Sequence, residues 1–170
     1  MQFRRIVSSL CLLAACTMAA IGCQSAPADN SAEPAIRQWL TDWTTAFQSK
    51  NIDGIKALYA SDVVAYDVIP PLQYVGKDAY IKDYGDFFGS FQGPLMVEIK
   101  DCHISSSGNL AYAACLERFS GTTTKGQKVD SWIRETSVFR LADGKWLDIH
   151  DHASYPADMD SGKALMDLKP

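Results

Sequence analysis

The chain has 170 residues, of which 47% are hydrophobic and 21% are charged. This length and composition fit a single packed domain and exclude repeat arrays and collagen-like chains. The formal net charge of -4 offers no basic field for holding phosphates, so we expect no nucleic-acid partner.

The first 23 residues have the pattern of an export segment. Arg4 and Arg5 precede an apolar run at 6–21, and small residues precede Cys23. This order resembles a bacterial lipoprotein signal, which is cleaved before a cysteine that then carries lipid. We therefore expect a lipoprotein-type signal at 1–23, a lipid on Cys23 as the only membrane contact, and a flexible tether at 24–31.

Two other interpretations of this segment stay open. Leu13 to Cys16 also matches the lipoprotein pattern, although cleavage there would leave the apolar residues 18–21 in the mature chain. Ordinary secretory cleavage would give a periplasmic or secreted protein without lipid. The apolar run is slightly short for a transmembrane helix, which needs roughly 20 residues. We favour Cys23 and a lipoprotein on the periplasmic face of a bacterial membrane.

Helical periodicity dominates the region after the tether. Apolar residues recur at helical spacing and predict helices at about 32–50, 52–59 and 77–88. Asn51 is a typical N-cap residue and separates the first two helices. A short β segment at Val63–Tyr66 follows, and Ile69-Pro70-Pro71 then breaks regular structure.

The second half of the chain has strand character. Turn-forming residues separate four such stretches, at 95–104, 110–119, 128–141 and 145–152. Helices followed by long strands predict an α+β fold, with three helices packed on one face of a curved antiparallel sheet that encloses a pocket. We expect the domain to cover 32–156 and residues 157–170 to form a C-terminal tail, because they show no core period.

Cys102 and Cys115 are the two cysteines beyond the export segment. If Gly108-Asn109 is a two-residue hairpin loop, Ser107 pairs with Leu110 and the two cysteines lie opposite each other. That arrangement would permit a disulfide, which persists in exported proteins. A register change of one residue would leave two small buried thiols on opposite faces, and we favour this second alternative.

Several stretches resemble known families. Residues 51–67 are similar to the second helix and first strand of bacterial ketosteroid isomerases, and Gly76 continues the likeness. Residues 135–139, 143–146 and 150–154 resemble the association domain of calcium/calmodulin-dependent protein kinase II. Both groups belong to the nuclear transport factor 2-like superfamily, together with SnoaL-like polyketide cyclases. The likeness covers nearly all of 35–156 and implies a cone-shaped fold that forms a homodimer.

The resemblance also implies roles for three residues. Asp67 falls where the isomerases keep their general-base aspartate, and a carboxylate at the mouth of an apolar pocket has its pKa raised toward values useful for moving a proton. The alternative role for Asp67 is to cap the turn before Pro70. The tyrosine that contacts the enolate oxygen in the isomerases falls on Trp43, whose indole N–H can donate a hydrogen bond but cannot act as an acid. The second oxygen-binding acid falls near Glu135.

Two pairings of the last hairpin place different residues in the pocket. If Gly144 follows a type I turn and Leu141 pairs with Lys145, one face of the hairpin carries Glu135, Ser137, Ile149, Asp151 and Ala153. The resemblance to the isomerases implies that this face is toward the pocket. If Asp143-Gly144 is a two-residue turn, the residues that join Asp151 are Arg134 and Thr136. Arg134 would then be available to an anionic ligand. We favour the first pairing.

The remaining candidates are aromatic residues and histidines. We expect part of the pocket lining to be Trp43, Phe47, Tyr59, Tyr66, Tyr74 and Phe87. His150 and His152 point the same way from one strand, but only His103 is left to complete a metal site that needs three or four ligands. We therefore expect no metal, and we place His150 and His152 at a subunit interface or behind the site.

These observations predict an exported domain that binds a small apolar or aromatic molecule. Its candidate catalytic residues are Asp67, Asp151 and Glu135, in an isomerase, cyclase or lyase reaction that needs no cofactor. The competing hypothesis is a non-catalytic ligand-binding or oligomerisation module on the same fold.

Overall fold

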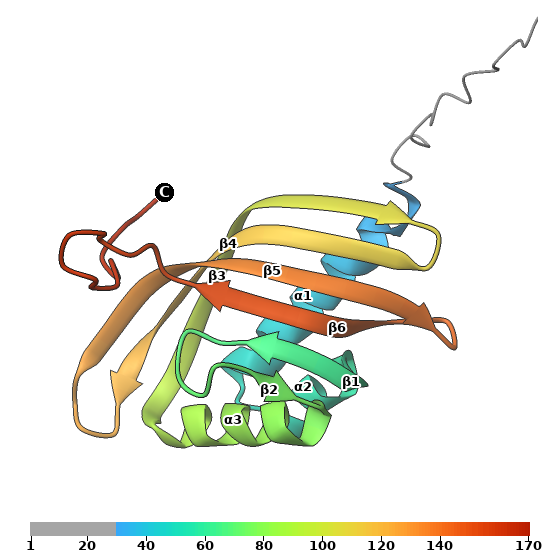
Figure 1. Ribbon diagram of the computed structural model, residues 1–170. Coiled ribbons are helices and arrows are strands. Elements are labelled where there is room, and N and C mark those ends of the chain that lie inside the picture. Colours follow the sequence, from blue (N-terminus) through green and yellow to red (C-terminus); the bar gives the residue numbers. More distant parts are fainter. Residues whose placement is uncertain (1–29) are drawn as a thin grey trace, which may run out of the picture.

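The computed structural model describes residues 30–170 (Figure 1). The expected signal at 1–23, the lipid site at Cys23 and most of the tether lie outside the described residues. Within 30–170, none of the helices has the length and apolar character needed to cross a membrane.

Three helices form close to their predicted positions. After a 3-10 turn at Asn30–Ala32 they are α1 (Glu33–Gln48), α2 (Ile52–Leu58) and α3 (Lys77–Gly89). Asn51 caps α2, because its side-chain oxygen accepts a hydrogen bond of 3.0 Å from the backbone N–H of Gly54.

A six-stranded sheet curves over these helices (Figure 1). Its strands are β1 (Tyr59–Tyr66), β2 (Tyr74–Val75), β3 (Phe91–Ser107), β4 (Leu110–Thr123), β5 (Lys128–Ala142) and β6 (Lys145–Ser154). The order across the sheet is β2-β1-β6-β5-β4-β3. The α+β class is confirmed, but the sheet is mixed, because β6 lies beside β1 and runs parallel to it.

The core fills the space between the helices and the concave face of the sheet. Phe139 of β5 is fully buried, and the indole of Trp39 packs edge-on against it at 4.9 Å between ring centroids. The same indole N–H donates to the carbonyl of Leu58 at 3.2 Å, which joins α1 to the end of α2. Apolar burial of this kind is the main favourable contribution to folding.

The last hairpin has the two-residue turn of the second alternative, but its ladder does not keep the register of that pairing. Asp143 and Gly144 form a two-residue turn with φ of 50° and 76°, a backbone region that suits glycine best. The ladder then shifts by one residue, because Ile149 is an extra residue in β6. This bulge places Ser137 opposite Asp151.

The bulge decides which side chains face the core. It keeps Glu135, Ser137, Asp151 and Ala153 on the inner face, as the first pairing predicted, although that pairing assumed a different turn. The assignment of Ile149 to this face was wrong, because Ile149 is the bulged residue.

A disulfide joins Cys102 of β3 to Cys115 of β4, so the structure contains the bridge and not the two thiols that we favoured. Ser107 pairs with Leu110 across the loop, as a two-residue turn requires. The bridge therefore follows from the pairing set by this turn.

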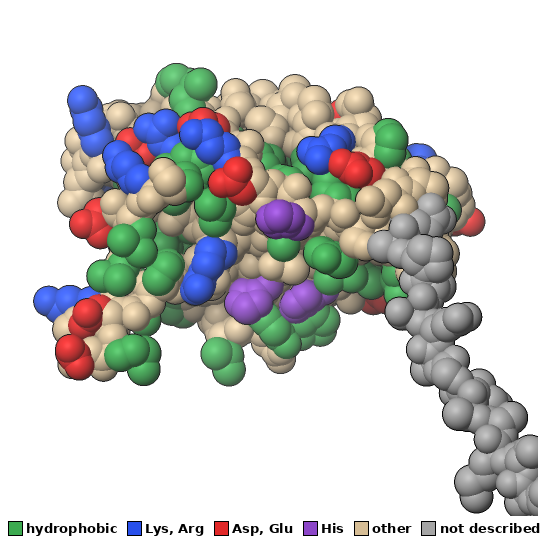
Figure 2. All heavy atoms as spheres, turned by 90° about the horizontal axis from the view of Figure 1, so that it is seen from above, with side chains coloured by type: hydrophobic (Ala, Val, Ile, Leu, Met, Phe, Trp, Pro, Cys, Tyr) green, Lys and Arg blue, Asp and Glu red, His purple; other side chains and the backbone are tan. Residues whose placement is uncertain are grey.

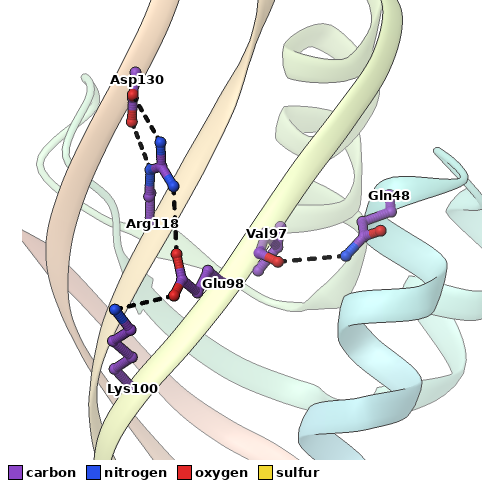
Figure 3. A network of polar contacts seen from close by, with 6 residues as sticks. All are labelled: Gln48, Val97, Glu98, Lys100, Arg118 and Asp130. Carbon is purple, nitrogen blue, oxygen red and sulfur yellow. Dashed lines mark hydrogen bonds and ion pairs between the residues drawn. The ribbon is translucent and has the colours of Figure 1, made fainter.

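Ion pairs cover the outer face near the edge of the sheet (Figure 3). Arg118 of β4 donates to both oxygens of Asp130 at 2.7 and 2.8 Å, and to Glu98 at 3.3 Å. Lys100 binds the same glutamate at 3.0 Å. Gln48 ties the end of α1 to the β3 backbone. Because these pairs are exposed to solvent, they contribute little to stability.

Candidate functional site

A cavity of about 390 Å³ lies between the helices and the concave face of the sheet. This volume is within the usual range for small-molecule sites. Its wall is mainly aromatic, with Trp39, Trp43 and Phe47 from α1 and Tyr80, Tyr84 and Phe87 from α3. The size and lining fit a small apolar or aromatic molecule.

Five carboxyl groups line the same cavity. They are Asp67 just after β1, Asp83 on α3, Glu117 on β4, Glu135 on β5 and Asp151 on β6. Within the described range 30–170, no Lys, Arg or His side chain contributes to this wall.

Two tyrosines hold the carboxyl group of Asp151. The hydroxyl groups of Tyr59 and Tyr80 each donate a hydrogen bond of 2.9 Å to Asp151 Oδ2. Only 6% of Asp151 is exposed. Buried carboxyl groups are stable only when they are hydrogen-bonded or paired, and the two tyrosines supply two of the hydrogen bonds that Asp151 needs.

A chain of hydrogen bonds extends from Asp151 to α1. The indole N–H of Trp43 donates to the Tyr84 hydroxyl at 3.1 Å, and the hydroxyl oxygens of Tyr84 and Tyr59 are 2.8 Å apart. Since Tyr59 donates to Asp151, Tyr84 donates to Tyr59. Burial raises the pKa of Tyr59, Tyr80 and Tyr84 well above the usual value, so all three remain protonated donors.

Burial favours the neutral form of two glutamates on the sheet. Burial raises the pKa of Glu117 to about 8, and burial together with the nearby charge of Asp151 raises the pKa of Glu135 well above its usual range. As carboxylate oxygens, Glu135 Oε1 and Asp151 Oδ1 have no donor among the described residues. Once protonated, Glu135 can donate a hydrogen bond to Asp151.

Asp67 caps the turn after β1 and also lies on the cavity wall. Its Oδ1 accepts a hydrogen bond of 3.3 Å from the backbone N–H of Ile69, as a turn cap would. The same side chain also lines the cavity. Burial, followed by the negative charge of Asp83, raises the pKa of Asp67 to about 6. A carboxyl group with this pKa both accepts and releases protons near neutral pH.

Comparison with known proteins matches this arrangement to one family. The model of the SnoaL-like domain matches residues 36–158. The chain belongs to the SnoaL-like family. No curated protein sequence matches.

Solved structures show the same fold as this SnoaL-like domain. A nuclear transport factor 2-like protein of unknown function from Pseudomonas putida KT2440 is 37% identical, with a TM-score of 0.77 over 85% of this chain and 100% of that chain. A ketosteroid isomerase-like protein from Erwinia carotovora atroseptica is 23% identical, with a TM-score of 0.64 over 74% and 97% of the two chains. A calcium/calmodulin-dependent protein kinase II association domain-like protein from Xanthomonas campestris is 25% identical, with a TM-score of 0.64 over 76% and 91%.

The structure brings most of the predicted site residues of this SnoaL-like domain to one cavity. Those on its wall are Asp67, Glu135, Asp151, Trp43, Phe47, Tyr59, Phe87, Ser137 and Ala153. Their catalytic roles stay predictions. The indole N–H of Trp43, expected to face the ligand, is bonded to Tyr84.

Five residues predicted to line the pocket lie outside it, and this expectation is corrected for Tyr66, Tyr74, Arg134, Thr136 and Ile149. Tyr66 packs on the outer face, with its ring 4.9 Å from that of His150 and 5.6 Å from that of His152.

The β5–β6 register and local hydrogen bonds explain why Arg134, Thr136 and Tyr74 lie outside the cavity. Arg134 is exposed and donates to the carbonyl of Tyr155 at 3.2 Å, and Thr136 pairs with His152 on the outer face. Tyr74 lies behind the wall and donates to Asp83 at 2.7 Å.

Sequence reasoning missed Glu117. It lies on the same face of β4 as Ala113 and Cys115, so an acid in the apolar alternation of this strand was the available signal. The tail also contributes Ala164 and Met166 to the wall, held by a hydrogen bond of 2.8 Å from the hydroxyl of Ser131 to the Met166 carbonyl. Nothing in the sequence pattern of 157–170 indicated that the tail folds back onto the cavity. Residues 30–170 contain no cluster of three or more His, Cys, Asp or Glu with metal-binding geometry.

Proposed function

We propose that this domain binds a small apolar or aromatic molecule and catalyses a cofactor-independent proton transfer on it, as an isomerase, cyclase or lyase. Asp67 is the base. The observation that carries this proposal is a carboxyl group with a pKa of about 6 on the wall of a mainly aromatic cavity. A base whose pKa lies near the working pH is the most effective proton carrier.

The reaction step follows from the groups on the wall. The Asp67 carboxylate takes a proton from the carbon beside a ligand carbonyl group. The electron pair of that C–H bond forms the C=C bond of the enolate, and the π pair of the C=O bond moves to the oxygen. Glu117, with a pKa of about 8, is neutral near pH 7 and can donate a hydrogen bond to this oxygen. Asp67 then returns the proton to a second carbon in an isomerisation, or a leaving group departs in a lyase reaction.

The test is hydrogen exchange at carbon. Enolisable aromatic ketones, beginning with 2-tetralone, are incubated with the protein in heavy water, and deuterium incorporation is followed by NMR. We expect Asp67→Asn to lower the protein-dependent rate by about 100-fold or more, the usual contribution of a general base. Asp42→Asn, on the exposed face of α1, is the matched control. Unchanged exchange in Asp67→Asn would remove the base role, and ligand binding without any exchange would favour the non-catalytic module.

We also propose that the protein is exported and anchored by lipid on Cys23. The order of charged, apolar and small residues in 1–23 supports this, and so does the disulfide, because such bonds persist in oxidising compartments. The test is fractionation with mass spectrometry. Cys23→Ser should release the protein from the membrane fraction, whereas a protein found in the soluble fraction without lipid would contradict the anchor.

The outer face of the sheet is our proposed homodimer interface. Tyr66 and Tyr112 are 39% and 43% exposed there, and Tyr66 packs against His150 and His152. Figure 2 looks down on this face and shows histidine side chains among hydrophobic ones. Sedimentation over a range of concentrations should show a dimer, and Tyr112→Arg should favour the monomer. A monomer at every concentration of the wild type would contradict this interface.

A further inference from the structure

The charges inside the cavity have one sign. The five acids share the cavity wall with tyrosine hydroxyl groups, which carry no net charge. Within 30–170, no basic side chain lies on that wall. Buried carboxyl groups are normally paired with cations or fully hydrogen-bonded. This cavity therefore attracts a positively charged group and repels an anion.

Two carboxyl oxygen atoms on the cavity wall lack a hydrogen-bond donor among residues 30–170. Asp151 Oδ1 and Glu135 Oε1 are buried and accept no hydrogen bond from any described residue. Only 6% of Asp151 is exposed. Within the protein alone, one proton shared between these two carboxyl groups meets the need. An ammonium group would supply N–H donors to both oxygens and a positive charge as well.

The rest of the wall suits the body of such a cation. Ammonium groups are attracted to the faces of Trp, Tyr and Phe rings. Helix α3 contributes Tyr80 and Tyr84 close to Asp151, and Trp43 of α1 lies on the same wall, bonded to Tyr84. We propose that the ligand is an organic amine with an aromatic or apolar body, whose ammonium group lies against Glu135 and Asp151. This inference rests on the proposed function in placing the ligand in the same cavity, and it adds the ligand's charge.

Binding of a cation should release protons. A positive charge lowers the pKa of the carboxyl groups around it, so the complex holds fewer protons than the free protein. Affinity then rises with pH as long as the amine stays protonated. The groups that face the site are the acids Asp67, Asp83, Glu117, Glu135, Asp148 and Asp151 and the hydroxyls of Tyr59, Tyr80 and Tyr84.

Three probes of similar shape isolate the charge. Calorimetric titration compares 2-phenylethylamine as the cation, 2-phenylethanol as the neutral molecule and 3-phenylpropionate as the anion. At pH 7.5 we expect the amine to bind at least tenfold more tightly than the alcohol, and the anion to show no binding. Between pH 5.5 and 7.5 the Kd of the amine should fall at least fivefold, with proton release seen as a buffer-dependent heat.

Matched variants locate the charge. In Glu135→Gln and in Asp151→Asn, the Kd values of the amine and the alcohol should lie within threefold of each other, and the alcohol should still bind. Asp42→Asn should keep the wild-type preference for the amine. Circular dichroism checks that each variant is folded, and if both fail to fold, the probe and pH comparisons on the wild type decide alone. Equal affinity for amine and alcohol, a pH-independent amine Kd, or binding of none of the probes would overturn the proposal.

This outcome is separable from that of the proposed function. Amine preference is read from binding, which needs no turnover, whereas the role of Asp67 is read from carbon exchange. A preference for the amine without hydrogen exchange at carbon would support the cation site and contradict the proton-transfer role. Exchange without a preference for the amine would support proton transfer and contradict the cation site.

Discussion

Ser137 lies directly opposite Asp151 in the β5–β6 ladder, one residue beyond the partner that the turn alone would give it. If the ladder continued from the two-residue turn without a bulge, Ser137 would pair with His150. The extra residue Ile149 shifts the pairing by one position. Because side chains alternate between the two faces of a sheet, this bulge brings Asp151 to the cavity and leaves His150 outside.

The tyrosine pair around Asp151 makes a prediction about stability. Tyr80→Phe removes one of the two donors to Asp151 Oδ2 and leaves this buried oxygen with Tyr59 alone. We expect the free energy of unfolding to fall by about 1–3 kcal/mol. Urea unfolding at pH 7 measures it.

A double-mutant comparison tests whether Tyr80 acts through Asp151. In the Asp151→Asn background, Tyr80→Phe should lower the free energy of unfolding by less than in the wild type, because the Tyr80 hydroxyl no longer stabilises a carboxylate. Asp42→Asn, on the exposed face of α1, should change stability by no more than about 0.5 kcal/mol. Equal losses for Tyr80→Phe in both backgrounds would show that the carboxylate is not what the tyrosine stabilises.

Glu117 predicts a dependence of stability on pH. Its pKa is about 8 in the folded protein, raised by burial from a usual value of 4.5, so the folded state binds more protons than the unfolded state between these pH values. The contribution of the neutral group is complete below the unfolded pKa and is lost as pH rises through about 8. Stability should therefore fall with rising pH in this window, by on the order of 1 kcal/mol per pH unit.

Glu117→Gln removes this titration while keeping the shape of the side chain. Unfolding of the variant from pH 4.5 to 8.5 should show a flatter profile than the wild type, with its largest relative gain at the alkaline end. Parallel profiles for the two proteins would mean that Glu117 is ionised in the folded state.

The disulfide predicts a difference under reducing conditions. Cys102 and Cys115 are 13 residues apart, and closing a loop of this length stabilises a fold by about 3 kcal/mol in the chain-entropy model. Reductant should lower the free energy of unfolding of the wild type by this order and leave a Cys102→Ala/Cys115→Ala variant unchanged. Alkylation of both thiols in unfolded protein without prior reduction would contradict the bridge.

The elements of this fold could be predicted because their signals are local. The helical period around Trp43 and the capping side chain of Asn51 need no knowledge of distant contacts. The pairing of β6 with β1 could not be predicted, because it joins segments far apart in the sequence, such as Val64 and His150, which are 86 residues apart. The bulge at Ile149 has no local signal either.

The site was predictable where a residue type stands out against its strand or a family likeness applies. Asp67 was placed by such a likeness and lies on the cavity wall. Tyr66 and Arg134 were misplaced because one residue of register changes the face of a side chain. The charge state of Glu135 could not be predicted, because it depends on burial and on the distance to Asp151, which the sequence does not contain.

The most direct test of the central claim is the pKa of the Asp67 carboxyl group. It is measured from carboxyl carbon chemical shifts in an NMR pH titration, with Asp67→Asn to assign the resonance. The account predicts a value of about 6, because burial in the cavity wall disfavours the charged form. A value at or below about 3.9, that of an exposed aspartate, would contradict it and leave Asp67 as a turn cap.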